Sequence, residues 1–188
     1  MMSMEGRITK ACFLEKGFRA TIRRIERIQN AELYEKYYKR RCEVARLNGG
    51  DANELLLKHG TKSTPPATIW QSSPSKSNTY AFDFRYSSDR NYFGRGAYFT
   101  DDATYVDGSP GLSKCYSHVL ENGDKQMFLA LVAAGCSEVL TTQKPDIRTP
   151  SCGYQSVKGP ITSAHDAIVV YELSQSYPMY LVTYSTLR

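Results

Sequence analysis

The chain has 188 residues, a length that suits one domain and can bury a substantial core. Its hydrophobic fraction of 41% and charged fraction of 23% are those of an ordinary globular protein, and no apolar run approaches the ~20 residues that a membrane-spanning helix needs. The net charge of +5 weakly favours anionic partners such as a dinucleotide, nucleic acid or an acidic protein segment.

The cysteine and histidine content limits the chemistry further. The five cysteines are odd in number and form no CxxC pair, and with only three histidines in the chain they do not predict a metal site. Free thiols are typical of a reducing compartment, and residues 1–10 lack an apolar segment of signal-peptide length. We therefore expect a cytoplasmic or nuclear protein without a membrane anchor. Basic residues between positions 23 and 46 alternate with glutamates, as on a solvated helix face, so nucleic-acid binding is not indicated.

The first elements in chain order are a short helix, a strand and a long helix. We expect the short helix within residues 1–18, ending at Gly17. Residues 20–29 favour a strand because β-branched residues recur among arginines, although the isoleucine spacing of three also allows a helix. The clearest helix spans residues 31–47, with Asn30 as its cap. Its apolar side is expected to contain Leu33, Tyr34, Tyr37, Tyr38, Val44 and Leu47.

The rest of the chain is predicted to form short strands, turns and small helices. The expected strands cover residues 55–57, 97–99, 127–133, 154–158, 167–171 and 180–184, with residues 175–178 joining the last two. Helical segments are expected at residues 66–70, from residue 101 onwards and again over residues 113–119, and a hairpin turn at Asn122 and Gly123. Many short strands without regular β–α alternation predict one α+β domain with antiparallel pairing.

Two segments carry chemistry suited to a ligand. Gly60 after His59 lets the backbone approach a ligand closely, and a histidine can donate to a sugar hydroxyl. Ser113 and Tyr116 lie three residues apart, which places a hydroxyl and an aromatic ring on one face of a helix. A heteroaromatic ring such as nicotinamide would fit between two tyrosines with a serine at its edge. Each feature alone is more typical of ordinary structure: a surface histidine at a strand end, a core tyrosine or a plain helix face.

Five motifs in this order resemble the catalytic domain of the poly(ADP-ribose) polymerase family. They are residues 59–61 (HGT), 93–99 (FGRGAYF), 113–116 (SKCY), 153–159 (GYQSVKG) and 175–184 (QSYPMYLVTY), and the resemblance covers roughly residues 21–184. It implies the ADP-ribosyltransferase fold, in which two packed, mainly antiparallel sheets with flanking helices surround an NAD cleft. It also implies a single catalytic domain over residues 1–188, without the helical regulatory domain that precedes this fold in DNA-dependent members.

The resemblance also implies roles for individual residues around NAD, which is used as a co-substrate without a metal. The NAD contacts would be His59, Gly60, Thr61, Arg85, Ser113 and Tyr116. His59 would bond a ribose hydroxyl, and Gly60 with Ser113 would hold the nicotinamide carboxamide. Tyr98 and Tyr116 would sandwich the nicotinamide ring. Arg85 would touch the adenosine half, or serve only as a loop charge. Such a pocket stabilises an oxocarbenium-like ribose by positioning and electrostatics while nicotinamide leaves.

The third catalytic position departs from the polymer-forming members of the family. Those members carry a glutamate four residues before a strand-ending aromatic residue; here that aromatic is Tyr171, and the position is Ala167. Asp166 points to the opposite face of a regular strand unless a bulge turns it inward. Members with an apolar residue here resemble mono-ADP-ribosyltransferases or are inactive. We therefore predict transfer of a single ADP-ribose from NAD to a protein acceptor. The alternatives are an inactive NAD-binding or protein-interaction module and a polymer-forming enzyme inactivated at Ala167.

Overall fold

The architecture is α+β, as predicted, and the computed structural model describes residues 4–71, 80–84, 91–108 and 114–186. The helices are α1 (Met4–Phe13), the 3-10 helix η1 (Glu15–Gly17), α2 (Ala31–Leu47), α3 (Ala67–Trp70) and α4 (Ala103–Asp107). The strands are β1 (Ala20–Arg27), β2 (Glu54–His59), β3 (Ala97–Phe99), β4 (His118–Val119), β5 (Lys125–Ala133), β6 (Ser137–Val139), β7 (Ser156–Pro160), β8 (Asp166–Val170) and β9 (Ser176–Thr186). No helix within these described segments is long and apolar enough to cross a membrane.

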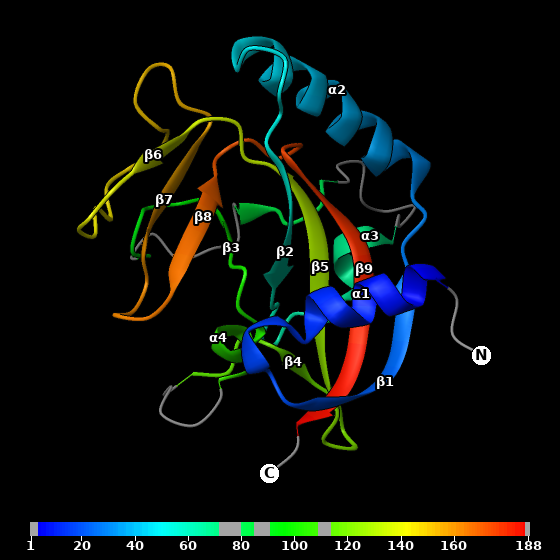
Figure 1. The fold of residues 1–188 in the computed structure, drawn as a ribbon. Helices are drawn as coiled ribbons and strands as arrows, with labels where there is room; N and C mark the ends of the chain where they lie inside the picture. The colour runs from blue at the N-terminus through cyan, green and yellow to red at the C-terminus, as the bar shows by residue number, and fades with distance from the viewer. Residues whose placement is uncertain (1–3, 72–79, 85–90, 109–113, 187–188) are drawn as a thin grey trace.

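Two mainly antiparallel sheets form the body of the protein (Figure 1). The larger sheet has the order β1-β9-β5-β2, with β4 added to β5, and the smaller sheet has the order β3-β8-β7-β6. The sheets are joined at an isolated antiparallel bridge between Lys58 in β2 and Thr100 just after β3. The Lys58 amide donates to the Thr100 carbonyl over 2.7 Å, and the Thr100 amide donates back over 3.1 Å. This bridge sets the end of β2 beside β3.

The larger sheet is covered on both faces, so most residues of its central strands β5 and β9 are buried. Because side chains alternate between the faces of a strand, Phe128, Ala130 and Val132 of β5 belong to the core that includes α2. Met127 and Leu129 of the same strand belong to the core on the other face, beneath α1. Figure 1 shows α1 crossing in front of β9 and β1, and α2 lying near the upper ends of the strands. The core therefore fixes the position of β2, which pairs with β5 along its whole length.

Helix α2 confirms the predicted bounds and cap. The Asn30 side chain accepts a hydrogen bond from the Leu33 amide over 3.0 Å, which satisfies one of the free donors of the first turn. The predicted apolar side is too wide, however. Leu33, Tyr37 and Val44 are buried, whereas the remaining three of the six predicted residues, Tyr34, Tyr38 and Leu47, are about half exposed. Only one narrow stripe of a 3.6-residue helix can face a single sheet.

The predicted helix over residues 113–119 is wrong in its described part. Residues 114–117 are irregular, and His118 and Val119 form β4, which pairs with β5 across the Asn122–Gly123 turn. The predicted hairpin turn is thus confirmed, and Gly123 supplies its positive φ of +83°. Pairing with the edge of β5 satisfies backbone groups that a short isolated helix would leave at its ends.

Two other boundaries differ from the sequence prediction. Helix α1 ends at Phe13, and the chain reverses through η1, where Lys16 and Gly17 both have positive φ. Strand β9 begins at Ser176, so residues 175–178 are not a simple connection. Pro178 is accommodated within β9 because the pairing register shifts beside its partner, between Leu129 and Ala130. A bulge of this kind removes the need for the backbone donor that proline lacks.

Candidate active site

The bridge between the two sheets brings His59 and Tyr98 together. His59 is the last residue of β2, Tyr98 is the middle residue of β3, and His59 Nδ1 lies 2.7 Å from the Tyr98 carbonyl oxygen. A carbonyl oxygen can only accept, so Nδ1 carries the proton, and Nε2 of the neutral ring is an acceptor. Within the described parts of the chain, Nε2 has no hydrogen-bond partner. The ring thus offers an acceptor for a ligand hydroxyl, where the sequence suggested a donor.

The surroundings of His59 keep its imidazole neutral. The ring makes a T-shaped contact with Phe82 at a centroid distance of 4.7 Å and lies 5.2 Å from the ring of Phe99. Burial among these groups lowers the pKa of His59 to about 4, and its bond to the Tyr98 carbonyl offsets only part of that effect. Near neutral pH, His59 is therefore an uncharged hydrogen-bonding group.

Tyr98 holds the glycine-rich turn that precedes its own strand. Its hydroxyl accepts from the Phe93 amide and donates to the Gly94 carbonyl, both over 2.8 Å. Gly94 has a φ of +69° and is in close contact with the Ile147 carbonyl, so no side chain could replace its hydrogen. Burial raises the pKa of Tyr98 to about 12, which keeps the phenol protonated. With the hydroxyl engaged in the turn, the half-buried ring is the part of Tyr98 that can meet a ligand.

Gly60 lies against the segment that carries Tyr116. A Cβ atom at Gly60 would overlap the Tyr116 carbonyl and would lie 2.8 Å from a methyl group of Val106. Glycine is therefore required here for close packing of two backbone segments. The neighbouring Thr61 donates its hydroxyl to the Thr64 carbonyl over 2.7 Å, so this side chain stabilises the following turn.

Tyr116 stacks on a residue that sequence reasoning missed. The rings of Tyr105 and Tyr116 lie 5.1 Å apart with an angle of 22° between their planes, and their hydroxyl oxygens are 3.2 Å apart. The Lys62 ammonium lies 4.6 Å from the centre of the Tyr116 ring. Tyr105 carried no motif signal; only its place in a short helix after an Asp cap pointed toward this segment. The sandwich of a nicotinamide ring between Tyr98 and Tyr116 remains a prediction.

Ala167 is buried at the third predicted catalytic position. It pairs with Gly159 across β7 and β8, and its methyl group belongs to an apolar cluster with Phe93 and Tyr171. The register of β8 is regular at this point, so Asp166 is not turned inward by a bulge. Instead, Asp166 is exposed and lies 3.9 Å from the Lys158 ammonium. Strand β8 therefore supplies no carboxylate at the position of Ala167.

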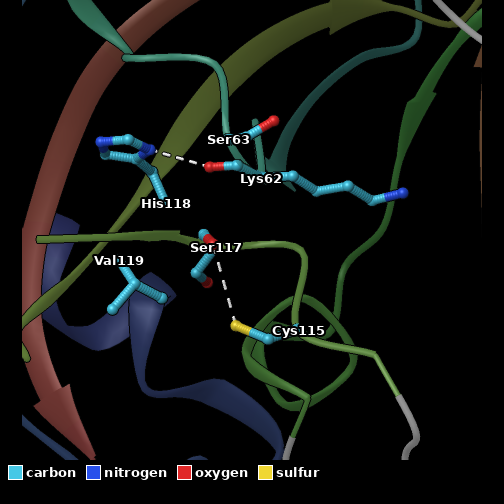
Figure 2. A pocket seen from close by; sticks show the side chains of 6 residues that line it. All are labelled: Lys62, Ser63, Cys115, Ser117, His118 and Val119. Carbon is cyan, nitrogen blue, oxygen red and sulfur yellow. Dashed lines mark hydrogen bonds between the residues drawn. The ribbon is translucent and has the colours of Figure 1, made fainter.

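A hollow of about 300 Å³ is lined by the segment that follows His59-Gly60-Thr61 and by residues on both sides of Tyr116 (Figure 2). It is lined by Lys62, Ser63, Cys115, Ser117, His118 and Val119. His118 Nδ1 donates to the Lys62 carbonyl over 2.8 Å, which ties β4 to the strand end that bears the histidine motif. These lining residues include none of those predicted to hold NAD, although Lys62 adjoins Thr61, and Cys115 and Ser117 flank Tyr116. Of the predicted NAD contacts, Arg85 and Ser113 lie outside the described part of the chain.

Comparison with known proteins places this geometry in context. The family model described as the poly(ADP-ribose) polymerase catalytic domain matches residues 7–169. The chain is 33% identical over 172 residues to protein mono-ADP-ribosyltransferase PARP12 of Mus musculus, covering 88% of the chain and 22% of that protein. It is 32% identical over 164 residues to a probable poly [ADP-ribose] polymerase of Dictyostelium discoideum, covering 86% and 43%. It is 28% identical over 186 residues to human protein mono-ADP-ribosyltransferase PARP11, covering 88% and 52%. The chain thus spans between about a fifth and about half of the length of these relatives.

Proposed function

Because the chain belongs to the family of poly(ADP-ribose) polymerase catalytic domains, we propose that it transfers a single ADP-ribose from NAD to a protein acceptor. In this reaction the bond between ribose C1′ and the nicotinamide nitrogen breaks. A new bond forms between C1′ and the acceptor atom, and nicotinamide leaves with the electron pair of the broken bond. An acceptor that carries a proton on the attacking atom loses it, whereas a carboxylate has none to lose. The observation that carries the proposal is the placement of buried Ala167 on the same sheet as Tyr98, with His59 fixed against the Tyr98 carbonyl.

The residues present fit the ribose and nicotinamide end of NAD. Neutral His59 offers Nε2 as an acceptor for a ribose hydroxyl, and its fixed tautomer orients that acceptor without introducing a positive charge. The Gly60 backbone and the rings of Tyr98 and Tyr116 are suited to an amide and a planar ring. These groups hold and orient the substrate, so the proposed catalysis rests on positioning more than on proton transfer by the chain.

The limit to a single transfer follows from Ala167. Chain elongation needs a carboxylate that polarises the hydroxyl of an already attached ADP-ribose. A methyl group cannot accept a hydrogen bond, and the adjacent Asp166 is exposed beside Lys158. The acceptor must then supply a nucleophile that needs no such help, for instance its own carboxylate. The two relatives named mono-ADP-ribosyltransferases support this conclusion.

Intact-mass spectrometry after incubation with NAD tests the proposal. The wild-type chain should gain separate additions of one ADP-ribose, and His59→Ala should reduce that gain about tenfold or more because the ribose loses its acceptor. His118→Ala is the matched control, since His118 lies in β4, outside the proposed NAD contacts, and this variant should retain the gain. Peptide mapping should find one unit at each modified residue.

Two results would contradict the proposal. Several ADP-ribose units linked in series at one residue would indicate polymer formation. Bound NAD with neither added mass nor released nicotinamide would indicate a binding module. An Ala167→Glu variant examined in parallel should favour units in series if the missing carboxylate is what limits elongation.

A further inference from the structure

Helix α4 holds the backbone of Tyr105 in place although it has only five residues. Its first turn is capped by Asp102, whose carboxylate accepts from the Thr104 amide over 2.8 Å. Its last turn is closed by Gly108, which adopts a left-handed conformation with a φ of +73°. Tyr105 therefore projects from a short helix that is fixed at both ends.

Tyr116 is fixed by its backbone beside the histidine motif. Its amide donates to the Val106 carbonyl, and its carbonyl accepts from the Lys62 amide, each over 2.8 Å. The same carbonyl packs against Gly60, as described above. The root of the Tyr116 side chain therefore cannot move away from Gly60 without breaking these bonds, so its ring stays at this end of the site.

The ring of Tyr105 is held against this surface by side-chain contacts alone. It stacks on Tyr116, donates a hydrogen bond to the Tyr116 hydroxyl, and packs on its other neighbour, His165, at a centroid distance of 5.4 Å. His165 in turn lies 3.3 Å from the Asp102 carboxylate that caps α4. Burial raises the pKa of Tyr105, so the phenol stays protonated and remains a hydrogen-bond donor.

A nicotinamide ring would use the same kind of contact. In NAD this ring is a planar aromatic cation, and both flat rings and cations favour the face of a tyrosine. Tyr105 already provides a stacked ring for Tyr116, and Lys62 already provides a cation 4.6 Å from its centre. Tyr105 and Lys62 therefore already offer Tyr116 a flat ring and a positive charge, the two properties by which it would recognise the nicotinamide ring.

We infer that Tyr105 is a specificity-determining residue, which competes with the nicotinamide ring of NAD for the face of Tyr116. Binding of the nicotinamide end then requires Tyr105 to turn away from Tyr116, while α4 and the Tyr116 backbone stay in place. The inference rests on the proposed function insofar as it takes NAD to be the ligand of this site. It concerns the affinity of the site for one part of NAD, whereas the proposed function concerns transfer.

Calorimetric binding of two ligands tests the inference. NAD carries the nicotinamide ring, and ADP-ribose lacks it. Tyr105→Ala should lower the Kd for NAD about threefold to tenfold, the factor to which the energy of one aromatic pair corresponds. The Kd for ADP-ribose should stay within about twofold. Tyr116→Ala should raise the Kd for NAD, and Tyr105→Phe, which keeps the ring but loses the hydroxyl bond, should lower it less than Tyr105→Ala does.

The opposite results would overturn the inference. A Kd for NAD that rises in Tyr105→Ala would mean that Tyr105 contributes to binding NAD, and a constant Kd would mean that it does not compete with NAD. An equal change in the Kd for ADP-ribose would show that the effect does not depend on the nicotinamide ring. His165→Ala, which removes the ring packed behind Tyr105, should shift the Kd for NAD in the same direction and replaces Tyr105→Ala if that variant fails to fold. Loss of transfer with these Kd changes intact would count against the proposed function alone.

Discussion

The two ends of the candidate site are held by different kinds of contact. His59 and Tyr98 lie in strands whose ladders continue into both sheets, and the bridge between Lys58 and Thr100 locks them together. Tyr105 and Tyr116 lie outside the strands and meet through stacked rings and one hydroxyl bond. The first end can change only together with the fold, whereas the second can change by rotation of a side chain. This contrast indicates that the candidate site is rigid at the end with His59 and Tyr98 and adjustable at the end with Tyr105 and Tyr116.

The largest expected effect is a pH dependence of protein stability caused by His59, at the rigid end. The pKa of His59 is about 4 in the folded protein against an ordinary 6.5, so the unfolded chain takes up a proton first as pH falls. Stability should be full above about pH 6.5 and decline by about 3 kcal/mol as pH falls towards 4. Urea unfolding of the wild type and of His59→Gln across this range measures it. Equal pH dependence in the two proteins would show that His59 is not protected in the folded state.

A smaller loss of stability is expected at Gly60, which follows His59 and packs against Tyr116. In Gly60→Ala the added methyl group meets the Tyr116 carbonyl and Val106, and backbone cannot yield as a flexible side chain can. We expect a loss of about 2 kcal/mol in the free energy of unfolding. Gly123→Ala is the comparison, because its position has positive φ but open space, and strain alone costs about 1 kcal/mol. Similar losses in chemical denaturation would mean that the segments at Gly60 can separate freely.

The smallest expected effect concerns the adjustable end. Asp102→Ala removes the cap of α4 and should lower the free energy of unfolding by about 1 kcal/mol, since one amide of the first turn loses its acceptor. Asp102→Asn, which retains a capping oxygen, should lose much less. Thermal unfolding of both variants measures the difference. If the two variants lose the same amount, the charge beside His165, and not the cap, holds α4 in place.

Local chemistry explains which elements could be predicted. Asn30 and the turn at Asn122 and Gly123 act on residues within three or four positions, so the bounds of α2 and the β4–β5 hairpin follow from short stretches of sequence. The helix predicted over residues 113–119 is wrong in its described part, residues 114–119, because a serine and a tyrosine three apart indicate a helix only if the segment is free to form one. In the folded chain, Val106 and Lys62 engage the backbone of Tyr116, and β5 offers an edge to His118.

The features of the candidate site also fall into those that the sequence predicts and those that only tertiary contacts decide. The order of the motifs in the sequence is sufficient to indicate the family and the alanine at the third catalytic position, residue 167. The outward direction of Asp166 followed from the alternation of side chains along a strand. The partner of Tyr116 and the tautomer of His59 were decided by tertiary structure. These features depend on contacts between residues far apart in the chain, and on burial, which no short stretch of sequence encodes. Sequence by itself determined what chemistry is present; packing decided which groups face one another.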